Sequence, residues 1–154
     1  MERVLDGTGF VRFLVVGVDD RTEVDQGNDS RLFPAEQGPG FRILSTKELA
    51  VDKVLAVFGR AEARDFLDLM AVESRFGLDA LLQLAAEKDN GFDLLVFAEM
   101  AQRFDRLRRD EFPVDDEHYE HLVGRVAEWR SEARRLGRPN ELHNDRGRGL
   151  DIGF

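Results

Sequence analysis

The chain has 154 residues, of which 42% are apolar, and its 31 acidic and 22 basic residues give a formal net charge of −9. This length suits one domain with a sizeable core, in which the twelve phenylalanines would dominate. The acidic balance argues against a general nucleic-acid coat protein, so any anion site must be a local basic cluster. Because the chain has no cysteine, disulfides, thiolate zinc sites and thiol nucleophiles are excluded.

Membrane insertion and export are also disfavoured by the sequence. No stretch approaches the roughly 18 consecutive apolar residues of a membrane span. The N-terminus, M-E-R-V-L-D-G, lacks the charged-then-apolar layout of a signal peptide. We therefore expect a cytoplasmic protein with no membrane partner.

The N-terminal part of the chain predicts a small β element. Residues 10–18 are β-branched and aromatic and predict a strand, residues 19–21 predict a turn, and residues 22–25 predict a second, shorter strand. Together they predict a short hairpin. Residues 26–40 are rich in Gly, Asn, Asp and Pro, which favours a loop.

The rest of the chain predicts a bundle of about five helices. Ser45 and Glu48 form a capping-box pattern at the start of the first helix, and Asp115 is a plausible cap for the last. Periodicity and stop signals predict helices at about residues 46–58, 62–76, 79–87, 93–104 and 115–137.

These elements predict an α+β fold with a single domain over residues 1–137. Neither an internal repeat nor a composition shift marks a boundary within that range. Residues 138–154 are rich in Gly, Asn and Arg, which predicts a disordered tail.

The first two predicted helices carry a dense group of charges beside an apolar stripe. Lys53 and Arg60 are seven residues apart, so they would share a helix face. Asp68 follows Arg64 by four residues and Asp65 by three, so these would also share a face. Guanidinium and ammonium groups bind phosphate oxygens, and the aspartates would orient them. The alternative is a set of ion pairs within and between helices, each contributing little.

Two further sets of residues are candidates on weaker grounds. Asp25 ends the second predicted strand, where a carboxylate can enter a metal site or simply begin a turn. His118 and His121 are three residues apart and could bring two imidazoles to one metal. The histidine pair therefore leaves open a metal-dependent hydrolase, on weaker grounds than the hypotheses given below.

The stretch G-F-R-I-L-S-T-K-E-L-A-V-D-K-V-L-A-V-F-G-R-A-E-A-R-D-F-L-D-L resembles the central helices of the AbiEii/AbiGii nucleotidyltransferase toxin family. That family supplies the toxins of bacterial type IV toxin–antitoxin and abortive-infection systems. The resemblance implies a minimal, polymerase-beta-like nucleotidyltransferase fold. It also implies transfer of a nucleotide from a nucleoside triphosphate to an RNA such as tRNA, with Mg²⁺ as cofactor and a separately encoded antitoxin as partner.

The same resemblance assigns roles to individual residues. Asp25 would be the strand carboxylate that orients the attacking hydroxyl and ligates metal, and Lys53 would contact the triphosphate. Arg64, Asp65 and Asp68 would form an R-D-x-x-D element that supports the phosphates. The expected site residues are therefore Asp25, Lys53, Asp65 and Asp68 for catalysis, with Lys53, Arg60 and Arg64 for phosphate binding.

The chain departs from the family in one respect. Family members carry a G-[ST] turn and a D-x-D pair that holds the metals, and this sequence contains no D-x-D. Gly7 and Thr8 could stand for the turn, and Asp19 and Asp20 for the metal-binding pair. This is a poor match, because in the family a helix lies between the turn and the pair. Adjacent aspartates on a strand would also face opposite ways.

We therefore expect the N-terminal catalytic segment to be missing, which makes the fold a partial one. Whether the chain is an enzyme is left open by this departure. The alternative is a non-catalytic helical protein that binds a partner or a nucleotide without turnover. Loss of the first lobe would also leave a sheet edge exposed, and such an edge favours self-association.

Overall fold

A computed structural model describes residues 2–7, 10–27 and 30–138, with the side chains of residues 2–10 and of Asp25 outside the described part. The described residues form small antiparallel β structures followed by five α-helices, which confirms the α+β class. Their contacts group into two compact units, Met1–Pro34 and Ala35–Phe154. This grouping does not test independent folding, so a single domain over residues 1–137 stays a prediction.

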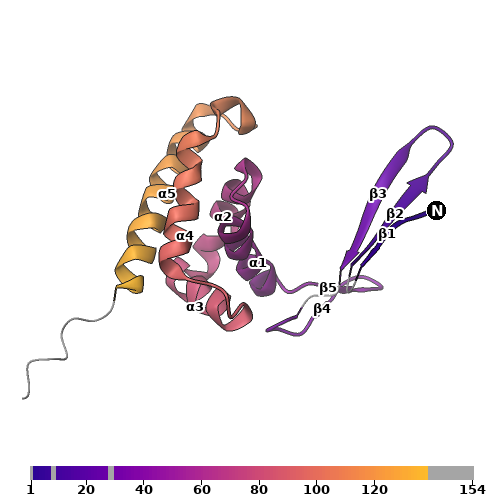
Figure 1. The fold of residues 1–154 in the computed structure, drawn as a ribbon, viewed down its shortest axis with the longest axis horizontal. Helices are drawn as coiled ribbons and strands as arrows, with labels where there is room; N and C mark the ends of the chain where they lie inside the picture. Colours follow the sequence, from indigo (N-terminus) through magenta and orange to yellow (C-terminus); the bar gives the residue numbers. More distant parts are fainter. Residues whose placement is uncertain (1, 8–9, 28–29, 139–154) are drawn as a thin grey trace, which may run out of the picture. The chain divides into compact units, whose positions relative to one another are not determined.

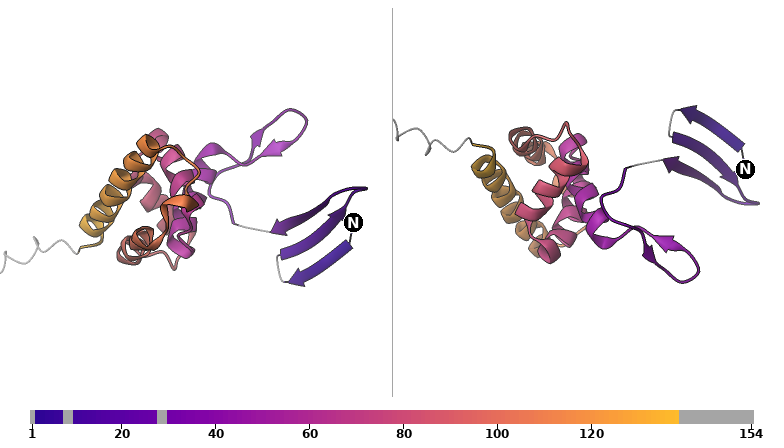
Figure 2. Two further views of the ribbon diagram at one scale, coloured as in Figure 1. Left: turned by 90° about the horizontal axis from the view of Figure 1, so that it is seen from above. Right: turned by 90° about the horizontal axis from the view of Figure 1, so that it is seen from below.

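The first unit is a three-stranded antiparallel sheet in which the strands follow chain order (Figure 2). The strands are β1 (Glu2–Gly7), β2 (Phe10–Val16) and β3 (Arg21–Gly27). The predicted hairpin corresponds to β2 and β3, which pair from Phe10 opposite Gly27 to Val16 opposite Arg21. Sequence reasoning missed β1, whose mixed E-R-V-L-D-G composition gives no clear strand signal.

The connection between β2 and β3 contains the two adjacent aspartates. The Gly17 amide donates to the Asp20 carbonyl at 2.8 Å, and both Asp19 and Asp20 are exposed. Residues 10–16 form a strand and not the helix that should precede a metal-binding aspartate pair, which argues against Asp19 and Asp20 as that pair. The order of the sheet leaves β1 and β3 as its two edges.

The second unit begins with a two-stranded ribbon of β4 (Glu36–Gln37) and β5 (Arg42–Ile43). Its turn is closed by a 2.8 Å hydrogen bond from the Gly38 amide to the Phe41 carbonyl. Gly40 has φ of +81°, a left-handed conformation that favours glycine. The range 26–40, which was expected to be a loop, therefore contains the end of β3 and the short strand β4.

The helices of the second unit begin and end close to the residues that the sequence predicted (Figure 1). Ser45 caps the first helix by accepting the Glu48 amide at 3.1 Å, and Asp115 caps the last by accepting the His118 amide at 2.8 Å. The fourth predicted helix changes to 3-10 geometry after Ala101. The elements are α1 (Thr46–Gly59), α2 (Ala63–Phe76), α3 (Leu78–Lys88), α4 (Leu94–Ala101), η1 (Gln102–Arg106), η2 (Arg109–Glu111) and α5 (Asp116–Gly137).

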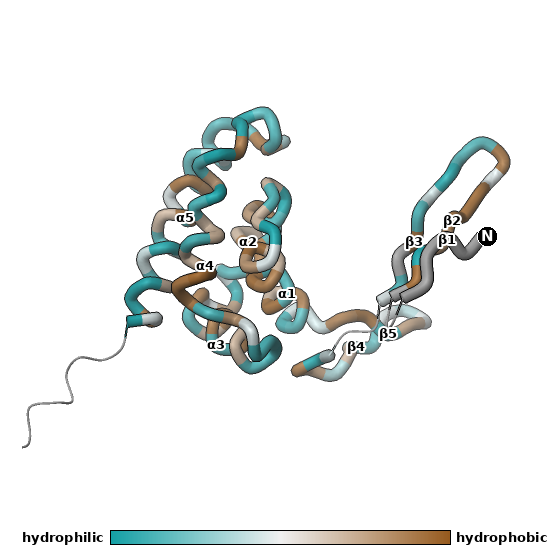
Figure 3. The backbone as a smooth tube through the Cα atoms, viewed as in Figure 1, coloured by the Kyte–Doolittle hydropathy of each residue, from teal (hydrophilic) through white to brown (hydrophobic). Residues whose placement is uncertain are grey.

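The core of this unit is built from one apolar face of each helix. Apolar and polar positions alternate along the helices, as amphipathic packing requires (Figure 3). Each of the five α-helices contributes fully buried side chains, including Val54, Phe66, Leu81, Phe97 and Trp129. Among the described residues, no helix combines the length and hydropathy needed to cross a bilayer.

An aromatic cluster holds the connection between α4 and α5. The Phe104 ring lies 5.3 Å from Phe66 and from Phe112, and 5.9 Å from Tyr119, centroid to centroid. Such pairs add about 0.5–1.5 kcal/mol each beyond the area that they bury. The cluster therefore fixes η1 against α2 and the start of α5.

Candidate functional site

The corner between α1 and α2 brings together four of the six predicted site residues. Lys53 on α1 donates from Nζ to Asp68 Oδ2 on α2 at 2.8 Å. The side chains are 24% and 35% exposed, so the pair is open to solvent on one side. An ammonium has three N–H donors, and this bond occupies only one of them. Lys53 can therefore bind an anion while Asp68 fixes its position.

The second pair at this corner is closed. Arg60 donates to both oxygens of Asp65, from Nε at 2.9 Å and from Nη2 at 2.7 Å, and the Glu62 amide adds a bond of 3.0 Å. The Asp65 side chain is 0% exposed and that of Arg60 is 49% exposed. Asp65 is the third residue of α2. By accepting the amide of Glu62, the N-cap residue, it forms part of a capping box that stabilises the start of the helix.

The electrostatics of Asp65 agree with this structural role. Burial alone would raise the pKa of Asp65, but the hydrogen bonds from Arg60 and Glu62 and the charges of Arg60 and Lys53 outweigh it, so the pKa lies below its ordinary value. The hydrogen bond to Asp65 raises the pKa of Arg60 in turn. The carboxylate stays ionised and committed to its arginine.

The backbone between the two helices is held in an uncommon conformation. Ala61 has φ of 52° and is 1% exposed. A left-handed conformation costs an L-residue roughly 1–2 kcal/mol, so neighbouring contacts must hold it. Burial of the Ala61 methyl group and the Arg60–Asp65 pair supply those contacts and fix the angle at which α2 leaves α1.

Arg64 differs from the other cations of the corner. It lies on α2 four residues before Asp68 and is exposed. Within the described part of the chain it makes no ion pair or hydrogen bond through its side chain. Its guanidinium is available to a ligand.

The R-D-x-x-D element therefore does not act as one charged face. Asp65 binds Arg60 inside the corner, Asp68 binds Lys53 on α1, and Arg64 faces solvent. Arg60 follows the last residue of α1, so it does not extend the face of Lys53 as its spacing predicted. Both contacts, Arg60–Asp65 and Lys53–Asp68, are ion pairs of the kind that the ion-pair alternative predicted.

The remaining candidates lie elsewhere. Asp25 belongs to β3 in the first unit, and its side chain is outside the described residues, so its role stays a prediction. His118 Nδ1 lies 2.7 Å from Asp115 Oδ1, and this exposed contact raises the pKa of His118. His121 is exposed on the same helix.

Magnesium finds no donor set among the described side chains. No group of three or more His, Asp or Glu residues there could hold a metal ion, and both aspartates of the corner already bind cations. The expected ligand Asp25 has its side chain outside the described residues, and the cofactor remains an expectation from the resemblance alone.

Two buried networks elsewhere in the helical unit are structural. Lys88 Nζ, on a side chain only 3% exposed, donates to Glu48 Oε1 at 2.6 Å and to Asp52 Oδ1 at 2.5 Å, which ties the end of α3 to α1. Buried charges are retained only when they are partnered in this way.

The other network joins α2 to α5 through Glu73. Its side chain, 5% exposed, accepts two hydrogen bonds from Arg125, at 2.6 and 2.9 Å, and one from Trp129 Nε1 at 2.7 Å. Arg125 also pairs with the exposed Glu128. The three donors satisfy the buried carboxylate.

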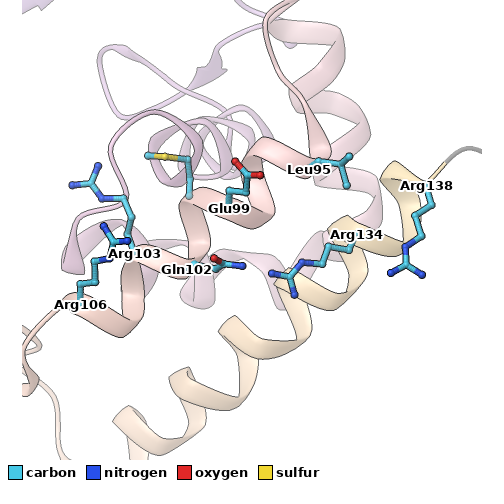
Figure 4. Close-up of a pocket in the computed structure, with 8 residues that line it drawn as sticks. Leu95, Glu99, Gln102, Arg103, Arg106, Arg134 and Arg138 are labelled. Atoms are coloured by element: carbon cyan, nitrogen blue, oxygen red, sulfur yellow. The ribbon is translucent and has the colours of Figure 1, made fainter.

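A concave site between α4 with η1 and the end of α5 was not predicted from the sequence. We call it the α4–α5 groove (Figure 4). Its volume is about 750 Å³. The residues that line it are Leu95, Glu99, Met100, Gln102, Arg103, Arg106, Arg134 and Arg138. The only sequence signal is arginine at the ends of two elements, R-F-D-R and R-R-L-G-R, about 30 residues apart.

The walls of the α4–α5 groove are held by two contacts. Arg130 on α5 donates to the Ala101 carbonyl at 3.0 and 3.2 Å and to Asp105 at 2.8 and 3.0 Å. A Cβ atom at Gly137 would lie 2.9 Å from Leu95 Cδ2, so this glycine permits the close approach of the end of α5 to the start of α4.

Comparison of the chain with family models, with curated proteins and with solved structures gave no match.

Proposed function

We propose that the chain is a nucleotidyltransferase-like toxin of a type IV toxin–antitoxin system, with the minimal nucleotidyltransferase fold of the AbiEii/AbiGii family. It would transfer a nucleotide from a nucleoside triphosphate to a tRNA acceptor, and a separately encoded antitoxin would control it. In that reaction the acceptor hydroxyl attacks the α-phosphorus and a new phosphodiester bond forms. The bond from the α-phosphorus to the α–β bridging oxygen breaks, pyrophosphate leaves, and the proton of the hydroxyl passes to water. The resemblance gives Asp25 the role of orienting this hydroxyl.

The observation that carries the proposal is the Lys53–Asp68 pair. Two helices meet at one cation, which uses one of its three N–H donors among the described residues and is partly exposed to solvent. Arg64 is exposed one helical turn before Asp68 and has no ion-pair partner among the described residues, so we propose it as a second cation for the ligand. A triphosphate, with several charged oxygens, suits such a pair of cations.

The second candidate is a nucleotide-binding or interaction protein without turnover. It is favoured by the burial of Asp65, which is 0% exposed and committed to Arg60 and to the Glu62 amide. One aspartate of the R-D-x-x-D element is thereby used to hold the helix corner. Under this candidate the corner would bind nucleotide through Lys53, and no group would be transferred.

An RNA-labelling assay tests the first proposal. Purified protein, magnesium and bulk tRNA would be incubated with each of the four nucleoside triphosphates, labelled at the α-phosphate. We expect one nucleotide to label tRNA, and we expect Lys53→Ala to reduce labelling at least 100-fold by removing a triphosphate contact. Arg108→Ala is the matched control, because Arg108 is exposed and paired with Asp110.

The outcomes separate the two candidates. Labelling that is equal in Lys53→Ala and in the parent would contradict a role for this residue in transfer. Nucleotide binding without labelling by any of the four triphosphates would favour the second candidate. Circular dichroism of each variant shows whether the fold is kept.

A further inference from the structure

Four arginines line the α4–α5 groove. Arg103 and Arg106 come from η1, and Arg134 and Arg138 come from the last turn of α5 and the residue after it. Figure 4 shows the first two at one end of the groove and the other two at the opposite end, with Glu99 and Gln102 between them. All four are exposed, and within the described residues none forms an ion pair or a side-chain hydrogen bond.

The charge of this groove is opposite to that of the protein. The chain as a whole carries a formal charge of −9, yet the groove gathers four guanidinium groups against the single carboxylate of Glu99. Like charges that share a concave surface repel one another, and a bound polyanion removes that repulsion. The α4–α5 groove is thus the local basic cluster that an anion site in an acidic protein requires.

Structural roles account for only part of the cluster. Cations in the last turn of α5 interact favourably with the helix C-terminus, which explains Arg134. That effect does not require two arginines of η1 to face the same groove. Arg130, by contrast, holds α5 to η1 through Ala101 and Asp105, so the arginines of both walls stand on a fixed frame. Preorganisation of this kind lowers the entropic cost of binding.

The basic surface is longer than one anion. A second hollow of about 610 Å³ adjoins the groove along α5 and shares Arg134 and Arg138 with it. Its further arginines, Arg130 and Arg135, are paired with Asp105 and with Glu132. The basic surface is therefore long enough for an extended ligand. Its arginines without ion-pair partners among the described residues lie in the α4–α5 groove.

We infer that the α4–α5 groove binds the phosphodiester backbone of a nucleic-acid strand. A guanidinium group binds two phosphate oxygens at once, and a strand presents one phosphate per nucleotide at a regular spacing. Gln102 can bond to base edges, and Leu95 and Met100 offer apolar contact between the arginines. The preference for a nucleic acid over an acidic peptide rests on the proposed function, whose acceptor is an RNA.

Fluorescence anisotropy with a labelled single-stranded RNA of about 20 nucleotides tests this inference, with a DNA of the same sequence as a second arm. The parent is expected to bind RNA with an affinity that falls steeply with salt. Arg103→Ala combined with Arg134→Ala should weaken binding at least tenfold in low salt. The slope of log K against log salt should fall by about 1.4, or 0.7 per lost phosphate contact.

A matched double variant, Arg75→Ala with Arg108→Ala, removes the same net charge outside the groove. Arg75 lies over the Phe76 ring and Arg108 pairs with Asp110. Binding by this control should stay within about twofold of the parent. Equal weakening in both double variants would overturn the groove as the site, because it would reduce the effect to net charge.

Further measurements test the ligand of the α4–α5 groove independently of the proposed function. Lys53→Ala should bind RNA like the parent, because Lys53 lies on α1 and outside the lining of the groove. RNA binding without nucleotide labelling would keep the groove and reject the transferase. Displacement of RNA by polyglutamate at equal charge concentration would overturn the nucleic-acid assignment in favour of an acidic peptide. DNA binding equal to RNA binding supports recognition of the backbone that both share.

Discussion

The buried ion-pair networks and the α4–α5 groove use the same kinds of side chain in opposite ways. Lys88 is 3% exposed and has two carboxylate partners, whereas Arg103 and Arg134 are exposed and have none among the described residues. A buried charge is tolerable only with its partner, so each network makes the packing of its helices depend on the pair. An exposed, unpartnered cation contributes little to folding and is free to bind a ligand.

The α1–α2 corner contains both kinds of pair within a few residues. Arg60 and Asp65 form a closed pair around a fully buried carboxylate, and Lys53 and Asp68 form an open one. The comparison predicts that Asp65 contributes mainly to stability and Lys53 mainly to binding. The following variants test this division, from the largest expected effect to the smallest.

Lys88→Met should have the largest effect on stability. It would leave Glu48, which is 0% exposed, as a buried charge without its ammonium, at a cost of about 3–5 kcal/mol in the free energy of unfolding. Urea denaturation followed by circular dichroism measures this. The double variant Lys88→Met with Glu48→Gln should recover part of the loss, and a single-variant loss below about 1 kcal/mol would contradict the structural role of the network.

Glu73→Ala should lower the free energy of unfolding by about 3 kcal/mol, slightly less than Lys88→Met, because Arg125 and the Trp129 indole lose their shared acceptor. Trp129 is the single tryptophan of the chain, so its fluorescence reports this site directly during unfolding. Glu128→Ala removes the exposed partner of the same arginine and should cost less than about 1 kcal/mol. Equal losses in the two variants would remove the distinction between buried and exposed partners.

Asp65→Asn should cost roughly 2 kcal/mol near neutral pH, with a characteristic dependence on pH. The pKa of Asp65 is lower in the folded protein than its ordinary value near 3.9, so the unfolded chain takes up this proton first as the pH falls. The contribution of the ionised group is complete above about pH 5 and is lost as the pH falls through the folded pKa. Urea denaturation of parent and variant at a series of pH values should give a difference that shrinks below about pH 4. A difference in unfolding free energy between parent and variant that stays constant from pH 3 to pH 7 would contradict this role of Asp65.

Arg134→Ala should have the smallest effect, within about 0.5 kcal/mol of the parent, because its side chain is exposed and lacks an ion-pair partner among the described residues. Thermal unfolding monitored by circular dichroism measures it. A loss above about 2 kcal/mol would place Arg134 with the structural arginines and weaken the case for a free cationic groove.

The sequence was informative about the helices because their signals are local. Caps at Ser45 and Asp115 and the periodic apolar faces lie within the elements that they define, so the predicted boundaries agree with α1 and α5 within about a residue or two. The 3-10 segment after Ala101 was missed. Its Phe104 packs against Phe66, Phe112 and Tyr119, and these contacts have no local sequence signal.

The sites were harder to predict because their partners are distant in sequence. The spacing R-x-x-x-R-D-x-x-D cannot tell that Asp65 turns toward Arg60 while Asp68 reaches Lys53, which lies 15 residues earlier on another helix. The α4–α5 groove depends on contacts between η1 and the end of α5, and Arg130 sets these from 25 residues beyond Asp105. Tertiary packing decides in both cases which charges are closed and which are open.

Calorimetric titration of the four nucleoside triphosphates into the protein, in magnesium buffer, tests most directly whether the open pair at the α1–α2 corner is a binding site. The account predicts that one nucleotide binds at a single site, that Lys53→Ala abolishes the binding, and that the groove variant Arg103→Ala with Arg134→Ala retains it. Absence of binding by any triphosphate, or equal binding by Lys53→Ala and the parent, would contradict it.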